Sequence, residues 1–442
     1  MRIPSFIDSP ACLSVTTITI VVVMKRALRL IHSLLTFGKL QMKKTILIIG
    51  AGFGGLWSAL SAMRLLSQYG REDIAVQVLA PMAELQVRPR FYEPGPDKMR
   101  APLTELFKAT GVEFIRGVAQ RIDTQADSVS YLDASGTAGE LRYTALVLAA
   151  GSKVALPAVD GLADHAFNVD SIDEARRLES HLESLAALPP SLARNTVVIA
   201  GGGFTGIETA CEMPARLKTV LGEHSEPRVI IVDRGEAIGA SMGVAMAPVI
   251  AEATAELGIE WCLGASVVAV DSQGVILADG QRIEANTVVW TAGVRASELT
   301  THVAAERDGF GRLHVDGNLR VIGQSAVFAT GDTAFAACDE LGNHAMMTCQ
   351  HAIALGRSAG NNAAAQLLDV APVPYSQTHY VTCLDLGAWG AVFTEGWDRQ
   401  VKFIREEGKQ LKTQINTQWI YPPIADKAIA LAAADPLIPV VA

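Results

Sequence analysis

One stretch of the sequence decides the fold: Thr45-Ile46-Leu47-Ile48-Ile49-Gly50-Ala51-Gly52-Phe53-Gly54-Gly55-Leu56. Its first five residues are a continuous apolar run rich in β-branched side chains, as a parallel strand buried on both faces requires. Apolar residues then follow with helical spacing, so the glycines lie in a turn between a strand and a helix. Gly50 permits the tight turn, Gly52 lets the backbone approach a pyrophosphate, and Gly55 lets helix and strand pack closely. The free N–H groups at such a helix start attract phosphate.

A second copy of this pattern stands later in the chain. The run Asn195-Thr196-Val197-Val198-Ile199-Ala200 leads into Gly201-Gly202-Gly203-Phe204-Thr205-Gly206-Ile207-Glu208, again as strand, turn and helix. A further strand, 228–232, ends at Asp233. One glycine turn alone could be a tight connection that binds nothing, whereas two in register in one chain predict two dinucleotide-binding folds.

The acid that ends the second strand bears on the nucleotide. Asp233 can accept both hydrogen bonds from an adenosine ribose diol, while a 2′-phosphate there would meet like charge. NADH is therefore favoured over NADPH, although the neighbouring Arg234 could hold a 2′-phosphate. In the first copy the equivalent strand ends at Ala80, where an acid would be expected. Either Glu84 or a backbone group then holds the ribose of the first nucleotide, or that ribose is bound loosely.

Three other apolar strands end in small residues, where the backbone can pass close to a cofactor. They are Leu146-Val147-Leu148-Ala149-Ala150-Gly151, Val288-Val289-Trp290-Thr291-Ala292-Gly293 and Ala326-Val327-Phe328-Ala329-Thr330-Gly331-Asp332. The last ends in an acid that we expect to open a helix. Asp332 could accept a hydrogen bond from a ribityl hydroxyl, and the alternative is an ordinary helix N-cap.

Composition narrows the class of protein. The 442 residues are 50% hydrophobic and 19% charged, with a net charge of −9, which is typical of a globular chain without a basic face for nucleic acid. None of the six cysteines forms a C-x-x-C pair, so we expect no disulfide framework, no zinc ribbon and no metal site. No run reaches the ~18 apolar residues of a membrane-spanning helix.

Residues 1–42 differ in character from the rest of the chain. Residues 25–35 form a short basic amphipathic pattern that could lie on an anionic membrane. Met42-Lys43-Lys44 stands directly before the first strand, as a natural start would. We therefore expect this extension to be an upstream translation artefact or a disordered tail outside the fold, with a membrane or targeting role as the alternative.

Over residues 43–390 the chain resembles the two-dinucleotide-binding-domain flavoproteins and, within them, the type II NADH:quinone oxidoreductases. The resemblance rests on both glycine turns, on Glu208 with Glu212 one turn later, on Thr291-Ala292-Gly293-Val294-Arg295, on Ala329-Thr330-Gly331-Asp332, and on the helix with Gln350 and Ala352. It implies FAD on the first fold and the Gly331-Asp332 segment, and NADH on the second fold. Hydride would pass from nicotinamide C4 to flavin N5 without an acid or base.

The resemblance also implies where single residues act. Glu208 belongs at the meeting place of nicotinamide and flavin, and Gln350 at the flavin edge beside the electron acceptor. The helix beginning near Thr348 would direct its N–H groups at the reduced ring. The cofactor-binding residues that we expect are Gly50, Gly52, Phe53, Gly54, Gly55, Arg88, Ala150, Gly151, Gly201, Gly203, Phe204, Thr205, Gly206, Glu208, Asp233, Ala292, Gly293, Gly331, Asp332, Gln350, His351 and Ala352. Arg88 and Arg90 are candidates for contacts with the cofactor or with the entrance to its site, and a position in a solvated loop explains them equally well.

The acceptor-side helix departs from the family pattern. Relatives usually show A-Q-x-A-x-Q, and here Ala354 replaces the second glutamine. Three functions therefore stay open: an enzyme that reduces a quinone, an NADH-dependent flavoprotein that passes electrons to a protein, a small molecule or oxygen, and a redox-sensing binding protein similar to apoptosis-inducing factor. Disulfide reductases need a paired dithiol, and sulfide:quinone oxidoreductases need a cysteine within residues 152–210, which contain none.

The fold class that we predict is α/β, with two Rossmann-like domains, the FAD domain being interrupted by the NADH domain, and a small C-terminal α+β interface region. The expected limits are 43–160 and 296–370 for the FAD domain, 161–295 for the NADH domain and 371–442 for the interface region. Strands are expected at 380–386 and 391–394. For the tail, peripheral membrane attachment and homodimer packing are equal alternatives. The expected location is the cytoplasm, with the inner face of the cell membrane as an alternative site.

Overall fold

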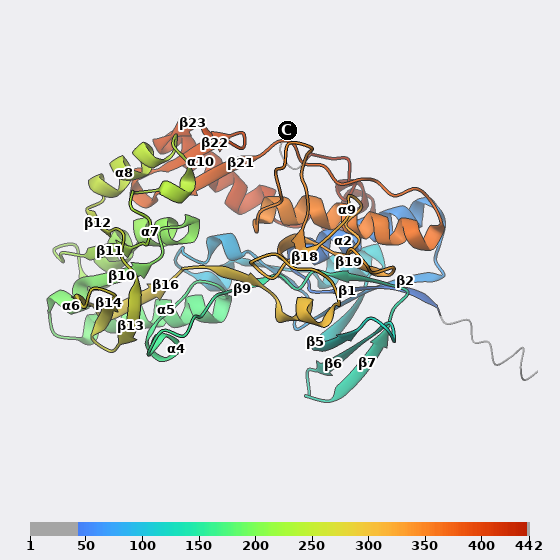
Figure 1. Cartoon of the computed structure of the whole chain (residues 1–442), viewed down its shortest axis with the longest axis horizontal. Helices are drawn as coiled ribbons and strands as arrows, with labels where there is room; N and C mark the ends of the chain where they lie inside the picture. The colour runs from blue at the N-terminus through green and yellow to red at the C-terminus, as the bar shows by residue number, and fades with distance from the viewer. Residues whose placement is uncertain (1–42, 440–442) are drawn as a thin grey trace, which may run out of the picture. The chain divides into compact units, whose positions relative to one another are not determined.

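The computed structural model describes residues 43–439 (Figure 1). Residues from Thr45 onward form one compact unit. Residues 1–42, which include Cys12, and residues 440–442 lie outside the described part of the chain, so our expectations for them are not tested. Within the described part, no disulfide is formed, and no helix has both the length and the apolar character that crossing a membrane takes.

The first sheet has seven strands in the order β19-β8-β1-β2-β5-β6-β7. Its strands are β1 (Lys44–Ile49), β2 (Ile74–Ala80), β5 (Glu113–Asp123), β6 (Ser128–Asp133), β7 (Ala138–Arg142), β8 (Ala145–Leu148) and β19 (Val327–Ala329). Pairs β1–β8, β8–β19 and β2–β5 are parallel, and β5–β6 and β6–β7 are antiparallel. Three predicted strands therefore lie side by side, and their carboxyl ends meet at one edge.

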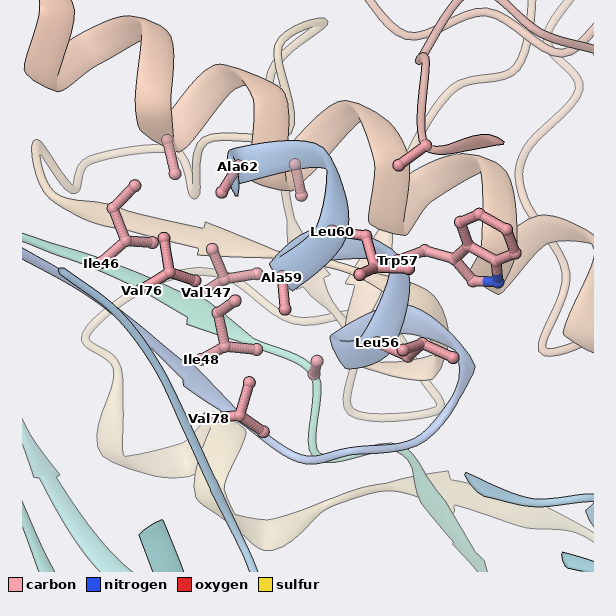
Figure 2. Packing of buried hydrophobic residues seen from close by; sticks show 14 of the residues in the cluster. Ile46, Ile48, Leu56, Trp57, Ala59, Leu60, Ala62, Val76, Val78 and Val147 are labelled. Atoms are coloured by element: carbon pink, nitrogen blue, oxygen red, sulfur yellow. The ribbon is translucent and has the colours of Figure 1, made fainter. Parts of the chain in front are cut away.

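Two helices cover one face of this sheet, α2 (Phe53–Gln68) and α9 (Cys349–Leu368). Figure 2 shows Ala59 of α2 facing Ile48 and Val147 of the strands, with Leu60 and Trp57 in the same cluster. Glycines allow the two helices to approach closely. A Cβ added to Gly360 would lie only 2.0 Å from the Ser58 carbonyl oxygen, and the Ser58 hydroxyl donates to the Gly356 carbonyl oxygen at 3.0 Å.

Replacing Gly360 by alanine is expected to lower the free energy of unfolding by about 3 kcal/mol or more, because the added methyl overlaps backbone and the helices must separate. Gly309→Ala is the matched control, since nothing lies within 4 Å of its added Cβ. Thermal denaturation of both variants measures the effect. Equal melting temperatures would contradict this account of the packing between α2 and α9.

The second sheet is parallel, in the order β12-β11-β10-β16. Its strands are β10 (Thr196–Ala200), β11 (Arg228–Val232), β12 (Ile259–Cys262) and β16 (Thr287–Trp290), with helices α5 (Ile172–Ser184), α7 (Phe204–Leu221) and α8 (Ala247–Glu256). A smaller antiparallel sheet joins β13 (Val267–Asp271), β14 (Gly274–Leu277) and β15 (Arg282–Glu284). The second glycine turn connects β10 to α7, as predicted.

The chain enters and leaves this second fold through two paired strands. They are β9 (Ser152–Val154) and β17 (Val294–Ala296), which are antiparallel. The fold that carries the second glycine turn is thus inserted into the sequence of the first. The domain limits given above remain predictions.

The C-terminal part forms an antiparallel sheet of β21 (Val381–Asp385), β22 (Ala391–Glu395) and β23 (Gln400–Ile404), where two strands were predicted. Helices α10 (Arg405–Gln414) and α11 (Lys427–Ala433) follow it, and neither was predicted. Leu384, Leu386 and Trp389 of this part pack in the same core as Val197, Ile199 and Ile207 of the second fold. Remaining short elements are β3 (Glu84–Gln86), β4 (Arg100–Pro102), α3 (Thr104–Thr110), α4 (Leu162–His165), α6 (Leu192–Asn195), β18 (Leu313–His314) and β20 (Ala334–Phe335).

Candidate functional site

The first glycine turn has the geometry that a nucleotide cradle requires. Gly50 has φ +107°, and a Cβ there would lie 2.3 Å from the Ala149 carbonyl oxygen. A Cβ on Gly55 would lie 1.9 Å from the Gly50 carbonyl oxygen, so only glycine fits either position. At Gly52, by contrast, nothing lies within 4 Å of an added Cβ, and the start of α2 is open to an incoming phosphate.

Several predicted residues come together at this turn. Gly54 faces Thr330, whose Cγ2 would lie 3.2 Å from an added Cβ. A Cβ on Gly331 would lie 3.4 Å from the Cβ of Ala352 on α9. The chain ends of β1, β8 and β19 therefore meet the first turn of α9, which gathers Ala150, Gly151 and the Gly331-Asp332 segment around one edge of the sheet.

Asp332 lies at this edge as a largely buried carboxylate. Its Oδ2 accepts from the Ser152 hydroxyl at 2.6 Å and lies 3.7 Å from Arg88 Nη1. Burial raises the pKa of Asp332, and the contacts to Ser152 and Arg88 oppose that rise. The expectation that Asp332 opens a helix is wrong: Asp332 lies inside a single 3₁₀ turn, Gly331–Thr333, and the chain continues at once into β20. Thr330 occupies the N-cap position of that turn.

The two arginines of the loop before Phe91 have different surroundings. Arg88 donates to the Ser152 hydroxyl at 2.8 Å and forms an ion pair with Asp170, so that it lies beside the Gly331-Asp332 segment. Arg90 forms an ion pair with Glu93 at 2.7 Å, and this contact raises the pKa of Arg90. Neither is a freely solvated loop residue, and only Arg88 is near the cradle.

The start of α9 offers further polar groups. The Thr348 hydroxyl caps the helix by accepting from the His351 N–H at 3.3 Å and contacts His351 Nδ1 at 2.9 Å. Burial lowers the pKa of His351 to about 4, so the ring is neutral. Gln350 accepts from Gln377 Nε2 at 3.2 Å and donates to the Val381 carbonyl oxygen at 3.4 Å. His351 Nε2 and Thr330 Oγ1 are buried without a hydrogen-bond partner.

These features fit a bound FAD. The open position at Gly52 can receive the pyrophosphate, and Asp332 can accept from a ribityl hydroxyl. Buried polar atoms without a partner are costly in a protein, and those of Thr330 and His351 lie at the segments that would line the cofactor.

The second turn repeats this geometry. Gly201 has φ +116°, a Cβ on Gly206 would lie 1.9 Å from the Gly201 carbonyl oxygen, and nothing lies within 4 Å of a Cβ on Gly203. Asp233 closes β11 and accepts from the N–H groups of Gly202 at 2.5 Å and Gly235 at 2.6 Å. Its carboxylate thus lies against the turn, where a ribose diol would bind, while Arg234 is exposed. The Ala292-Gly293 segment lies beside the turn, since a Cβ on Gly201 would be 3.0 Å from Ala292 N.

Glu208 on α7 is buried and forms an ion pair with Lys412 of α10 at 2.7 Å. Its Oε1 also accepts from the Asp385 N–H at 3.1 Å, and Lys412 donates to the Cys383 carbonyl oxygen at 3.0 Å. Burial raises the pKa of Glu208 to about 7, although Lys412 opposes that rise. Burial acts to lower the pKa of Lys412, but Glu208, Cys383 and Asp385 together outweigh it, and the net shift is upward.

Further charged groups surround this pair. Lys409 contacts Asp385 at 2.6 Å and Glu212 at 3.8 Å, and the Tyr92 hydroxyl donates to Asp385 at 3.1 Å. Neither Lys409 nor Lys412 was predicted to lie at the site. Their spacing of three residues, which places both on one face of a helix, was the available signal. No group of residues suited to holding a metal ion occurs within residues 43–439.

A comparison with protein families places the chain in context. A model described as pyridine nucleotide-disulphide oxidoreductase matches residues 44–356. The chain is 42% identical over 401 residues to the NADH dehydrogenase-like protein Rv1812c of Mycobacterium tuberculosis (strain ATCC 25618 / H37Rv), covering 89% of this chain and 98% of that protein.

More distant relatives carry more specific names. The type II NADH:quinone oxidoreductase Ndh of the same strain is 29% identical, covering 65% of this chain and 66% of that protein. Among solved structures, NDH2 from Plasmodium falciparum in complex with NADH matches with a TM-score of 0.71, at 14% identity, over 89% of this chain and 97% of that one. This last likeness shows the fold.

Proposed function

Because this chain belongs to the pyridine nucleotide-disulphide oxidoreductase family, we propose that it is an NADH dehydrogenase that passes electrons through FAD to a quinone-type acceptor. FAD and NADH are its cofactors, and bound FAD supplies the redox chemistry between NADH and the acceptor. The observation that carries the proposal is the pair of glycine turns, which are open at Gly52 and Gly203 and closely approached by backbone at Gly50, Gly55, Gly201 and Gly206.

The chain's own residues bind and orient. The starts of α2 and α7 hold the two pyrophosphates, Asp332 holds the ribityl chain and Asp233 holds the ribose of NADH. With FAD bound, the start of α9 would direct backbone N–H groups toward negative charge on the ring. His351 is neutral there, so the helix N–H groups rather than an imidazolium provide this stabilisation.

Two residues act where the rings meet. We place Glu208 beside the nicotinamide and Gln350 at the acceptor side. Strand β21 contacts both side chains, which supports their placement at one site. With a pKa of about 7, Glu208 can hold or release a proton near neutral pH, and Lys412 stabilises the charged form. Gln377 and Val381 fix the Gln350 amide.

Stopped-flow mixing with NADH, followed by reoxidation with a quinone analogue or with oxygen, tests the proposal. We expect rapid reduction of the flavin and reoxidation that is faster with the quinone. Rapid turnover without a response to the quinone would favour a protein, small-molecule or oxygen acceptor, to which Ala354 points. Slow reduction with a long-lived charge-transfer band would favour a redox-sensing protein similar to apoptosis-inducing factor.

The C-terminal part exposes large apolar side chains, among them Trp419 (59% exposed), Ile424 (66%) and Leu437 (74%). We propose that these exposed side chains contact the membrane that holds the quinone. Co-sedimentation of the full chain with lipid vesicles is then expected, and it should weaken in Trp419→Ser. A stable dimer that buries Trp419 and does not sediment with vesicles would establish the alternative.

Replacing Asp233 by alanine is expected to raise the KM for NADH about tenfold or more and to reduce the preference of the enzyme for NADH over NADPH. The variant loses a charged acceptor for the ribose and the repulsion of a 2′-phosphate. Steady-state kinetics with both nucleotides measures the change. Asp279→Ala, an exposed acid of the same fold, is the control. An unchanged cofactor preference would remove Asp233 from the site.

A further inference from the structure

Trp261 stands at the carboxyl end of β12, directly beside the end of β11. It pairs in register with Ile231, and the next residue pairs with Val232, which precedes Asp233. The side chain is partly buried. A large aromatic ring therefore lies next to the acid that was assigned to the ribose, on a strand that no glycine motif marks.

The indole touches the second glycine turn. A Cβ added to Gly202 would lie 2.8 Å from Trp261 Cζ3 and 3.0 Å from Asp233 Oδ2. The ring and the Asp233 carboxylate thus both lie beside Gly202, around the position that a Cβ would take. This contact also explains why a third glycine occurs in the run Gly201-Gly202-Gly203, since a side chain at Gly202 would displace the ring or the carboxylate.

Helix α8 holds the indole in this orientation. Trp261 Nε1 donates to the Thr254 hydroxyl at 3.1 Å, and that hydroxyl donates to the Ile250 carbonyl oxygen at 2.8 Å. Thr254 is 1% exposed. The backbone beside the ring is fixed as well, because Asp233 N donates to the Cys262 carbonyl oxygen at 3.0 Å.

We propose that Trp261 is a positioning residue for the adenosine half of NADH. Its ring holds the Asp233 carboxylate against the Gly202 N–H and keeps water from that side, so that the remaining lone pairs of the carboxylate face the ribose diol. A charge in a drier, fixed position discriminates more strongly against a 2′-phosphate than a hydrated and mobile one. The inference rests on the proposed function, since it requires that NADH binds at this turn.

Kinetics with two electron donors tests the proposal. In Trp261→Leu, we expect the KM for NADH to rise about tenfold with kcat nearly unchanged, and the preference for NADH over NADPH to fall by a similar factor. Reduced nicotinamide mononucleotide lacks the adenosine half, so its kinetics should not change. Trp261→Phe keeps an aromatic ring but loses the Nε1 donor, so it should recover part of the affinity, and Thr254→Val, which keeps the indole and removes only its hydrogen-bond acceptor, should have a smaller effect than Trp261→Leu.

Binding of ADP-ribose to the FAD-loaded enzyme, measured by calorimetry, gives a readout independent of turnover. We expect about tenfold weaker binding in Trp261→Leu and unchanged binding in Tyr69→Leu, an exposed aromatic residue of the first fold. Equal affinity for ADP-ribose in the wild type and Trp261→Leu would overturn the inference. An increase in the KM for reduced nicotinamide mononucleotide as large as that for NADH would overturn it too. If the leucine variant does not fold, Trp261→Phe and Thr254→Val decide by the same comparison. Absence of ADP-ribose binding in the wild type would instead overturn the proposed NADH site.

Discussion

Replacing Lys412 by methionine is expected to lower the free energy of unfolding by about 3–5 kcal/mol above neutral pH, because it leaves the Glu208 carboxylate buried without its partner. Both side chains are only 7% exposed, and their contact is 2.7 Å. The remaining bond from the Asp385 N–H cannot replace a full charge. Denaturant unfolding of the FAD-loaded enzyme measures the change.

The loss is expected to depend on pH. The folded-state pKa of Glu208, about 7, exceeds its ordinary value of 4.5, so the stability that its proton provides is fully present below about pH 4.5 and is lost as the pH rises through 7. Without Lys412, the folded-state pKa rises further, and the loss extends to higher pH. The difference between the wild type and Lys412→Met should therefore be small in acid and grow with pH.

Two controls separate this cause from a general effect of removing a lysine. Lys402→Met removes an exposed partner of Glu395 and should cost at most about 1 kcal/mol. The double variant Glu208→Gln with Lys412→Met removes both charges and should recover much of the stability. A loss that is equal at pH values below and above neutrality would contradict the assigned ion pair.

Replacing Asp332 by alanine is expected to weaken FAD binding about 10–100-fold, since a charged acceptor of a ribityl hydrogen bond contributes about 1.5–3 kcal/mol. The variant should be purified with less flavin per polypeptide and should regain flavin only at high FAD concentration. Titration of the stripped protein with FAD measures the change. Burial already raises the pKa of Asp332, so its charge is maintained at a cost in free energy unless a ligand uses it.

Asp164→Ala is the control for Asp332, because it removes an exposed acid that contacts neither glycine turn. Flavin content equal to that of the wild type in Asp332→Ala would remove this residue from the cofactor site. Loss of flavin in both variants would indicate a general loss of stability instead.

The sequence predicts the strands and glycine turns well because each depends on local rules. Thr45–Ile49 must be buried on both faces, and Gly50 and Gly55 lie where a Cβ would overlap backbone, so the pattern survives in the sequence itself. The same holds for the strand end at Asp233, whose place follows from the order of strand, turn and helix.

What the sequence could not provide are the contacts between distant segments. Lys412 contacts Glu208 although 204 positions separate them in the chain, and nothing near either residue in the sequence specifies the other. In the sequence, Trp261 cannot be distinguished from an aromatic residue of the core, and only the structure shows that its ring lies beside Gly202. Asp332 was expected to open a helix because an acid after a strand commonly caps one, whereas here tertiary pairing continues the chain as β20.

The insertion of one fold into the other has a consequence for how the chain is made. The ribosome completes β10, β11, β12 and β16, with β13–β15 between the last two, so the inserted sheet has all its strands before β19 has been synthesised. The outer sheet waits longer, because Leu146 pairs with Val327 and α9 follows later still. On a nascent chain, the pyridine nucleotide site should therefore form first, and the flavin should be captured only near the end of translation.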